Sequence, residues 1–276
     1  MDERAELSEF LKSRRARLRP ADVGLRDYGR TRRVAGLRRE ELARLAGVSI
    51  AHYTRLEQGR GEGISDEVLD AVGAALDLDR DERSYLHQLA RRPRPCAEDT
   101  FEPDMPTGLR HLLAAFPRTP ALVIGRHTDI IGWNPLAVAV FGDFAAMPHG
   151  RRTLSHLLFT RPSARELYGT DWPRVAYEHV AHLHVLLGRY RGNPGLAAHV
   201  DEMRELSADF DRMWPNHPVA QVRSRAYLLR HPIVGELTLR RELISLPDAP
   251  ACCGLELFAA EPGSASERAL RELANR

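Results

Sequence analysis

The sequence predicts two domains of different fold class, an all-α domain over residues 1–92 and an α+β domain over residues 108–276. Apolar residues recur at helical spacing in five segments between residues 4 and 90. Farther along the chain, apolar β-branched runs alternate with helical segments. Residues 93–107, which are rich in proline and poor in apolar periodicity, form the predicted linker.

The first two helices are predicted from leucine spacing and from the residues that stop them. Segment 4–18 places apolar residues on one face, and Pro20 prevents its simple continuation. Segment 37–46 has leucines and small alanines on one side and is broken by Gly47. A Gly- and Arg-rich connection joins these two helices.

The other three helices of this domain have recognisable ends. Ser49 can cap the third helix, which runs to Gly59, a position that suits a left-handed residue. Ser65 can cap the fourth helix, and Asp79 with Glu82 forms a box-like start to the fifth. Five helices therefore fill residues 4–90.

The second domain is predicted to hold an antiparallel five-stranded sheet covered by helices. Residues 121–124 and 128–133 are two apolar runs around a polar, Gly-containing turn, which is typical of a hairpin. Residues 134–144 turn helical, and residues 153–214 are helical in several pieces. Three further strands are predicted at 221–230, 234–246 and 251–260. A terminal helix is predicted to begin at Ser264 or Ser266. Strands at both ends of the domain favour the α+β class.

Positive charge is concentrated near the amino terminus. Residues 12–60 carry 14 basic and five acidic side chains, whereas the whole chain has a net charge of only +2. Lys12 is the only lysine, so a general preference for arginine is the alternative explanation. That preference would spread arginine evenly, and the remainder of the chain is slightly acidic. The clustered charge therefore indicates a polyanionic partner such as nucleic acid.

Residues 37–60 have the spacing of a helix-turn-helix. Ala43 is small enough for two helices to touch, Gly47 permits the turn, and Val48, Tyr53 and Leu56 supply apolar anchors for the second helix. A helical hairpin that does not bind DNA is the alternative, and the coincident basic charge argues against it.

The second helix of this motif is predicted to enter the major groove of double-stranded DNA. Arg55 is the best candidate to read a guanine, because its fork can contact both acceptors of that base. Ser49 can contact a base edge or a phosphate, and Arg38, Arg39 and Arg60 are placed to contact phosphates. The predicted DNA-binding residues are Arg38, Arg39, Ser49, Ile50, Ala51, His52, Thr54, Arg55 and Arg60.

With these residues in place, the chain resembles a known family. LRREELARLAGVS with YTRLEQGR resembles the helix-turn-helix of the Cro/lambda-repressor (XRE) class, and in particular its actinobacterial members that carry an MmyB-like domain. TPALVIGRHTDIIGWNPLA, RELYGTDW, SADFDRMWPNHPV and HPIVGELTLRREL resemble segments of that domain, in the same order. The resemblance implies a transcription regulator whose second domain has a PAS-like fold and binds a small apolar molecule.

In repressor domains similar to this one, a glutamate of the recognition helix pairs with an arginine of the first helix. The glutamate here is Glu57, and the corresponding arginine is Arg14 or Arg15, so a salt bridge to one of them is expected. An unpaired carboxylate near the end of that helix would be unfavourable against the helix dipole and would repel DNA.

The effector pocket is predicted between the sheet and the helical segment 153–214. The predicted ligand-binding residues are Trp133, Phe141, Phe159, Trp172, Leu183, Leu187 and Trp214, although each of the aromatic residues can equally well pack the core. The strands are expected to contribute Val123, Ile131, Leu228, Leu237 and Leu257. Such a lining fits a lipid-like or aromatic molecule better than a sugar or nucleotide.

Other functions are not supported by the sequence. His179, His182 and His184 invite a metal site, but only the first two share a helical face and no nearby acidic residue or thiol completes a set, so no metal site is predicted. Motifs for hydrolases, phosphate loops and zinc peptidases are absent, so neither an enzyme nor a cofactor is expected. Cys96, Cys252 and Cys253 suggest reduced, buried thiols.

The sequence thus predicts a cytoplasmic regulator, without a membrane span, that binds DNA as a homodimer and responds to a small apolar effector. Effector binding is expected to act through the linker, as the only covalent connection between the two halves. The alternative makes the second domain a dimerisation or protein-docking module. An elongated apolar cavity of some hundreds of Å³ would favour the effector, and a sealed interior would favour the alternative.

Overall fold

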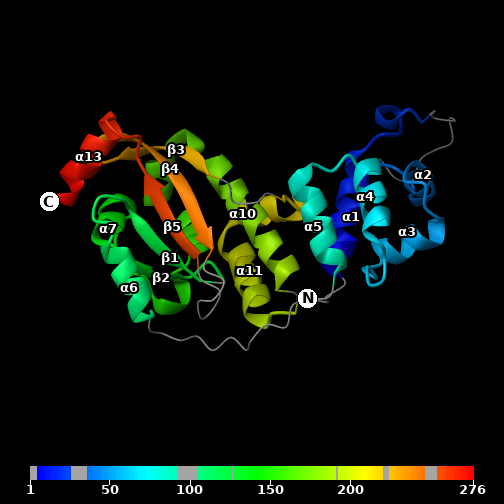
Figure 1. Ribbon diagram of the computed structural model, residues 1–276, viewed down its shortest axis with the longest axis horizontal. Coiled ribbons are helices and arrows are strands. Elements are labelled where there is room, and N and C mark those ends of the chain that lie inside the picture. Colours follow the sequence, from blue (N-terminus) through cyan, green and yellow to red (C-terminus); the bar gives the residue numbers. More distant parts are fainter. Residues whose placement is uncertain are drawn as a thin grey trace. The chain divides into compact units, whose positions relative to one another are not determined.

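The computed structural model describes residues 5–25, 36–91, 105–125, 127–190, 192–219, 224–245 and 254–276. The chain forms two compact units (Figure 1). Unit 1 contains residues 1–96, 181–197 and 213–221, and unit 2 contains the remainder. Within the described ranges, the helices are all too short or too polar to cross a membrane.

The chain passes between the units at several points besides the proline-rich segment. The expectation that the linker is the only covalent connection is therefore wrong. Helix α10 (Trp172–Arg189) and helix α11 (Pro194–Leu206) each contribute residues to both units. Most of the predicted linker 93–107 and the three cysteines lie outside the described residues, so predictions about them stay predictions.

The helices of the first domain follow the predicted order, and their bounds in unit 1 are α1 (Ala5–Arg17), η1 (Pro20–Val23), α2 (Arg39–Leu45), α3 (Ile50–Glu57), α4 (Asp66–Ala75) and α5 (Arg80–Ala90). The side chains of Ser49 and Ser65 accept backbone hydrogen bonds at the starts of α3 and α4, and Asp79 with Glu82 forms a capping box at α5. Gly59 adopts the left-handed conformation, with φ of 78°. The predicted five-helix domain is confirmed.

The core of unit 1 is apolar and is shared by all five helices and the end of α10. Leu7, Phe10 and Leu11 of α1 are almost completely buried, and Tyr85 of α5 meets Phe10 edge to face with ring centroids 5.1 Å apart. Val185 of α10 belongs to the same buried cluster. The helix-turn-helix is therefore packed on a core to which the second half of the sequence contributes.

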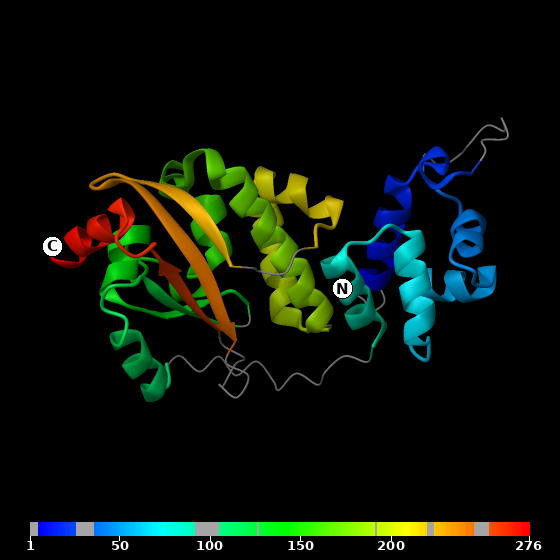
Figure 2. The ribbon, with the colours of Figure 1, turned by 45° about the horizontal axis from the view of Figure 1, so that its top comes forward.

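Unit 2 is built on a five-stranded antiparallel sheet in the order β2-β1-β5-β4-β3, which confirms the predicted α+β class. The strands are β1 (Ala121–Ile124), β2 (Ile130–Trp133), β3 (Arg225–His231), β4 (Gly235–Ser245) and β5 (Gly254–Ala259). Gly235 provides the left-handed residue, with φ of 74°, at the turn of the long, twisted β3–β4 hairpin (Figure 2).

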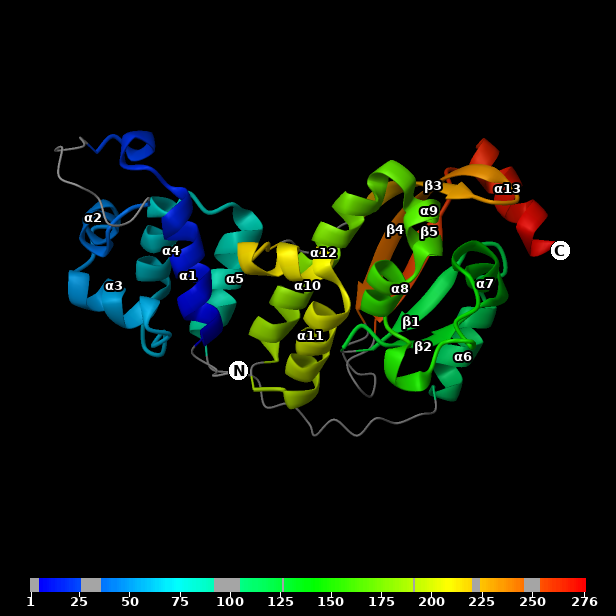
Figure 3. The ribbon, with the colours of Figure 1, turned by 180° about the vertical axis from the view of Figure 1, so that it is seen from behind.

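Helices lie on both faces of the sheet. Helices α8 and α9 lie in front of the strands in the reverse view (Figure 3), whereas α6 contacts β1 and β2, and α13 packs on α7 and β4. The remaining elements of this half of the chain are α6 (Thr107–Ala114), α7 (Pro135–Phe141), η2 (His149–Arg151), α8 (Leu154–Thr160), α9 (Pro162–Tyr168), η3 (Gly169–Asp171), α12 (Ala208–Met213), η4 (Trp214–Asn216) and α13 (Ala265–Ala274). The side chain of Ser264 caps α13.

Candidate functional site

Helices α2 and α3 form the predicted helix-turn-helix. Ala43 is fully buried, and Gly47 in the turn has φ of 66°, a conformation that suits glycine. Tyr53 and Leu56 of α3 are buried, and Val48 is half-buried against the same core. The side chain of Ser49 accepts the backbone N–H of His52 at 3.1 Å, which fixes the start of α3.

The residues predicted to contact DNA lie mainly on the exposed side of this motif. Ser49, Ile50, Ala51, His52, Arg55 and Arg60 are exposed, whereas Thr54 is half-buried. Ile50 is a large apolar side chain with 54% of its surface exposed. Exposure of Arg55 beside a buried Leu56 gives α3 one face for its own core and another for a partner. The arginines at positions 26, 30, 32 and 33, which add to the basic charge, lie outside the described residues.

Glu57 at the end of α3 is the buried centre of an ionic cluster. Arg15 Nε donates to one carboxylate oxygen at 2.7 Å, Arg39 Nε donates to the other at 2.6 Å, and the Tyr53 hydroxyl donates at 2.8 Å. The expected salt bridge from α1 is confirmed, with Arg15 rather than Arg14 as the partner. Burial opposes the carboxylate, but these three donors outweigh it, so the pKa of Glu57 is lowered. Arg39, which is predicted to contact a phosphate, therefore already forms an ion pair with Glu57.

Unit 2 contains a small pocket between the sheet and helices α8, α9 and α10. Its volume is about 30 Å³. The cavity that would favour an effector is much larger, some hundreds of Å³. It is lined by Leu122, Phe141, Leu154, Leu157, Leu158, Tyr168, Val175, His179, Tyr227, Arg241, Glu256 and Phe258. The pocket lies between the layers where it was predicted, but it has room for little more than a water molecule.

Only Phe141 among the seven predicted ligand-binding residues lines this pocket. In unit 2, Phe159 packs on Trp172 with centroids 5.8 Å apart, and Trp133 packs on Phe144 at 5.4 Å, so these aromatic rings fill the core around it. The other three predicted residues are buried in unit 1, namely Leu183, Leu187 and Trp214.

Three of the predicted strand residues, Val123, Ile131 and Leu257, pack in or against a cluster with α6 and do not line the pocket. Val123 of β1 packs in a cluster with residues of α6, together with Leu255 of β5, and Leu257 packs against the same cluster. The neighbouring residues Leu122 and Glu256 face the pocket, because successive side chains of a strand point to opposite faces. All four residues of β1 are buried, so the sequence pattern does not distinguish its two faces.

The pocket is apolar except for a few polar side chains. Arg241 forms an ion pair with Glu256; the side chain of Arg241 is 16% exposed and that of Glu256 is 3% exposed. Burial opposes the charge of Arg241, yet the carboxylate of Glu256 raises the pKa of the guanidinium above its ordinary value. The buried Nε of Arg241 has no hydrogen-bond partner, which leaves one donor beside an apolar lining.

The three histidines of α10 do not form a site together. His179 lines the pocket, and its Nε2 lies 2.8 Å from the hydroxyl of Ser155, which also contacts His199 Nε2 at 2.8 Å. Burial lowers the pKa of His199 to about 4, so that side chain is neutral near pH 7. His184 instead lies in unit 1, fully buried and stacked on Trp214 at 3.9 Å.

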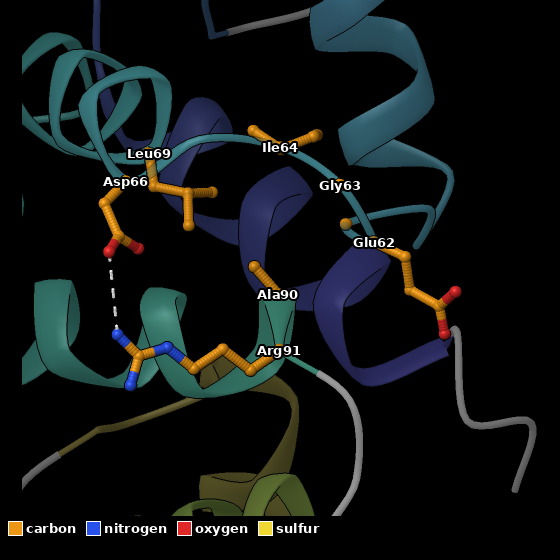
Figure 4. Close-up of a pocket in the computed structure, with 8 residues that line it drawn as sticks. Glu62, Gly63, Ile64, Asp66, Leu69, Ala90 and Arg91 are labelled. Carbon is orange, nitrogen blue, oxygen red and sulfur yellow. Dashed lines mark ion pairs between the residues drawn. The ribbon is translucent and has the colours of Figure 1, made fainter.

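Unit 1 has a hollow of its own between the α3–α4 connection and the end of α5 (Figure 4). Its volume is about 240 Å³, and an ion pair of 3.7 Å between Arg91 and Asp66 crosses its rim. Ile64, Leu69 and Ala90 supply its apolar side chains. None of the exposed residues of α3 listed above lines this hollow, and the sequence pattern does not predict it.

Comparison with family models assigns both parts of the chain. Residues 6–86 match a helix-turn-helix domain, and residues 105–273 match the MmyB-like transcription regulator ligand binding domain. No curated protein matches the chain. The helix-turn-helix seen at α2 and α3 and the layered sheet of unit 2 agree with these two assignments. The chain therefore belongs to the MmyB-like transcription regulators, and it joins a helix-turn-helix DNA-binding domain to a ligand-binding domain.

Proposed function

We propose that this regulator binds a specific operator as a homodimer, and that a small, largely apolar effector held in unit 2 changes its affinity for that operator. The observation that carries the DNA-binding part is the exposed side of α3, where Arg55 and Ile50 lie beyond a buried Tyr53 and Leu56. Arg55 reads a base, and Arg38 and Arg60 contact phosphates.

The homodimer is proposed from the amount of DNA that one motif can cover. A single recognition helix buries too little DNA surface for the usual affinity of specific regulators. Two copies would contact half-sites about 34 Å apart, one turn of the duplex, or a multiple of that distance.

The effector is proposed to enter between the sheet and α8, α9 and α10. A cavity of about 30 Å³ is too small for it, so binding requires these helices to move away from the sheet. The apolar lining favours an apolar body, and the partnerless Nε of Arg241 favours one hydrogen-bond acceptor on the effector. Because α10 contributes to both units, its displacement offers a route from the effector to the DNA-binding domain.

The small cavity also favours a second candidate. A nearly filled interior is what a dimerisation or protein-docking module without a small ligand would have. The two candidates differ in their response to apolar compounds, so one screen distinguishes them.

The test is a thermal-shift screen of the full chain with fatty acids and aromatic metabolites, followed by DNA-binding assays with any hit. An effector at a hundredfold excess over its dissociation constant should stabilise the protein by about 2.7 kcal/mol. The double variant Arg241→Gln with Glu256→Gln keeps hydrogen-bonding groups without leaving a lone buried charge. It should bind acceptor-bearing hits about tenfold more weakly, since such a loss equals one good hydrogen bond.

Arg240→Gln is the matched control, because Arg240 is the exposed neighbour of Arg241 on β4. This variant should retain the shift of the wild type. If no apolar compound shifts the unfolding temperature, the effector proposal fails and the docking module is the better interpretation.

A further inference from the structure

Three buried side chains that the sequence keeps far apart meet inside unit 1. Glu6 lies on α1, His184 on α10, and His217 directly after η4. Each offers one ligand atom, and the three atoms lie within 4.8 Å of one another. The three residues are between 0% and 5% exposed. The set of two imidazoles and one carboxylate is a common zinc ligand set in proteins.

The hydrogen bonds of the two histidines fix which ring nitrogen carries the proton. His184 Nε2 donates to the carbonyl oxygen of Trp214 at 3.2 Å, and His217 Nε2 donates to the carboxylate of Glu9 at 3.1 Å. In a neutral imidazole the other nitrogen, Nδ1, then carries a lone pair. Both Nδ1 atoms are buried and have no hydrogen-bond partner. His184 Nδ1 lies 3.9 Å from Glu6 Oε2.

This arrangement gathers two nitrogen lone pairs and a carboxylate oxygen at a buried place in unit 1. Two lone pairs beside a buried carboxylate repel one another unless a cation lies between them. The cluster therefore offers a cation two nitrogen lone pairs and one carboxylate oxygen.

Neighbouring residues hold the three side chains in place, in the way that residues next to a metal site orient its ligands. His217 has a left-handed backbone, with φ of 43° and ψ of 53°, which is uncommon for a residue other than glycine. Arg14 Nη2 donates to its carbonyl oxygen at 2.6 Å and secures that conformation. The Tyr85 hydroxyl lies 3.2 Å from Glu6 Oε2 and 3.0 Å from the carbonyl oxygen of His184, so its one proton is shared between the two acceptors. A histidine that donates one nitrogen to a carboxylate or carbonyl, as both do here, is oriented for metal binding through the other.

We propose that Glu6, His184 and His217 bind one zinc ion through a carboxylate oxygen and the two Nδ1 atoms, with water as the fourth ligand. Zinc bonds to nitrogen and oxygen of about 2.0–2.2 Å require the three ligand atoms to approach one another slightly. The ion would link α1 of the DNA-binding domain to α10, which also supplies Val175 and His179 to the pocket of unit 2. Zinc would thus set the stability of the unit that carries the helix-turn-helix.

The test measures metal binding by the full chain after chelator treatment and dialysis. Titration with zinc should show one ion per chain and raise the unfolding temperature, and cobalt(II) in its place should give the strong visible absorption of a tetrahedral site. His217→Gln should remove the cobalt absorption. Glu9 would act on the metal only through its hydrogen bond to His217. The Glu9→Gln variant should therefore weaken zinc binding roughly 10- to 100-fold while leaving one site per chain.

His87→Gln is the matched control, since His87 lies between Asp66 and Asp70 on the surface and could bind zinc adventitiously. It should retain the full stoichiometry and the cobalt absorption. The proposal is overturned if the wild type takes up less than one equivalent of zinc, or if His87→Gln abolishes uptake while His217→Gln does not. Circular dichroism of each variant separates loss of a ligand from loss of the fold.

Discussion

Replacing Glu57 by glutamine removes the charge at the centre of the ionic cluster of α1, α2 and α3. Glu57 is 1% exposed and faces Arg15, which is 15% exposed, and Arg39, which is 50% exposed. Breaking a buried ion pair by removing one partner costs about 3–5 kcal/mol. Because both arginines reach solvent in part, the cost here should lie at or below the lower end of that range, about 2–3 kcal/mol.

The assay is thermal unfolding of the wild type and of Glu57→Gln under identical salt and protein concentration. A loss of this size should lower the unfolding temperature of unit 1 by roughly 10 °C. Glu40→Gln is the control, since the Glu40 side chain is 59% exposed and forms an exposed ion pair of 3.8 Å with Arg38. That variant should change stability by less than about 0.5 kcal/mol.

The pH dependence gives a second, independent check. The folded-state pKa of Glu57 is lowered, so its ion pairs contribute stability above the unfolded carboxyl pKa of about 4.3, and this contribution is lost as the pH falls through the folded-state pKa. The difference between wild type and Glu57→Gln should therefore be largest near neutral pH and shrink in acid. An unchanged unfolding temperature at pH 7, or a difference that grows in acid, would refute the proposed role of the cluster.

Two further predictions concern DNA recognition and the backbone of unit 1. Arg55→Ala should weaken binding to the specific operator by about 1–3 kcal/mol and relax the preference for one base. Arg38→Ala should weaken binding to all DNA sequences alike and should reduce by about one the slope of log affinity against log salt concentration. Identical, sequence-independent changes in both variants would contradict base reading by Arg55. Gly61→Ala should destabilise unit 1, because the added Cβ would lie 2.7 Å from the Cα of Ala90, whereas Gly108→Ala meets nothing within 4 Å. Equal unfolding temperatures for these two glycine variants would show that the chain relaxes at Gly61.

Local sequence signals determined where the elements begin and end. Ser49, Ser65 and Asp79 are predicted at the starts of helices as caps, and each accepts the backbone hydrogen bond that a cap provides. The last helix is predicted to begin at Ser264 or Ser266, and the structure selects Ser264 as its cap. A cap depends on atoms within one helical turn, so neighbouring residues suffice to predict it. The same holds for Gly47, whose turn conformation follows from the short step between α2 and α3.

Contacts across the chain were predicted only in part. The partner of Glu57 was limited to Arg14 or Arg15 by resemblance, and the structure selects Arg15, because helix rotation decides which of two adjacent residues faces α3. The pocket lies between the predicted layers, but its strand residues are one position away from most of those expected. Strands that are buried on both faces give no alternating pattern from which to choose a face.

The sequence by itself therefore determined the fold class, the helix-turn-helix and the family. Only the tertiary structure decided that residues 181–197, which include the end of α10, and residues 213–221 belong to unit 1, so that Leu183, Leu187 and Trp214 do not line the pocket. It alone brought Glu6 to His184 and His217, whose spacing in the sequence shows no metal-binding motif. Periodicity and caps report interactions within a few residues, whereas a site built from three distant segments exists only after the whole chain has packed.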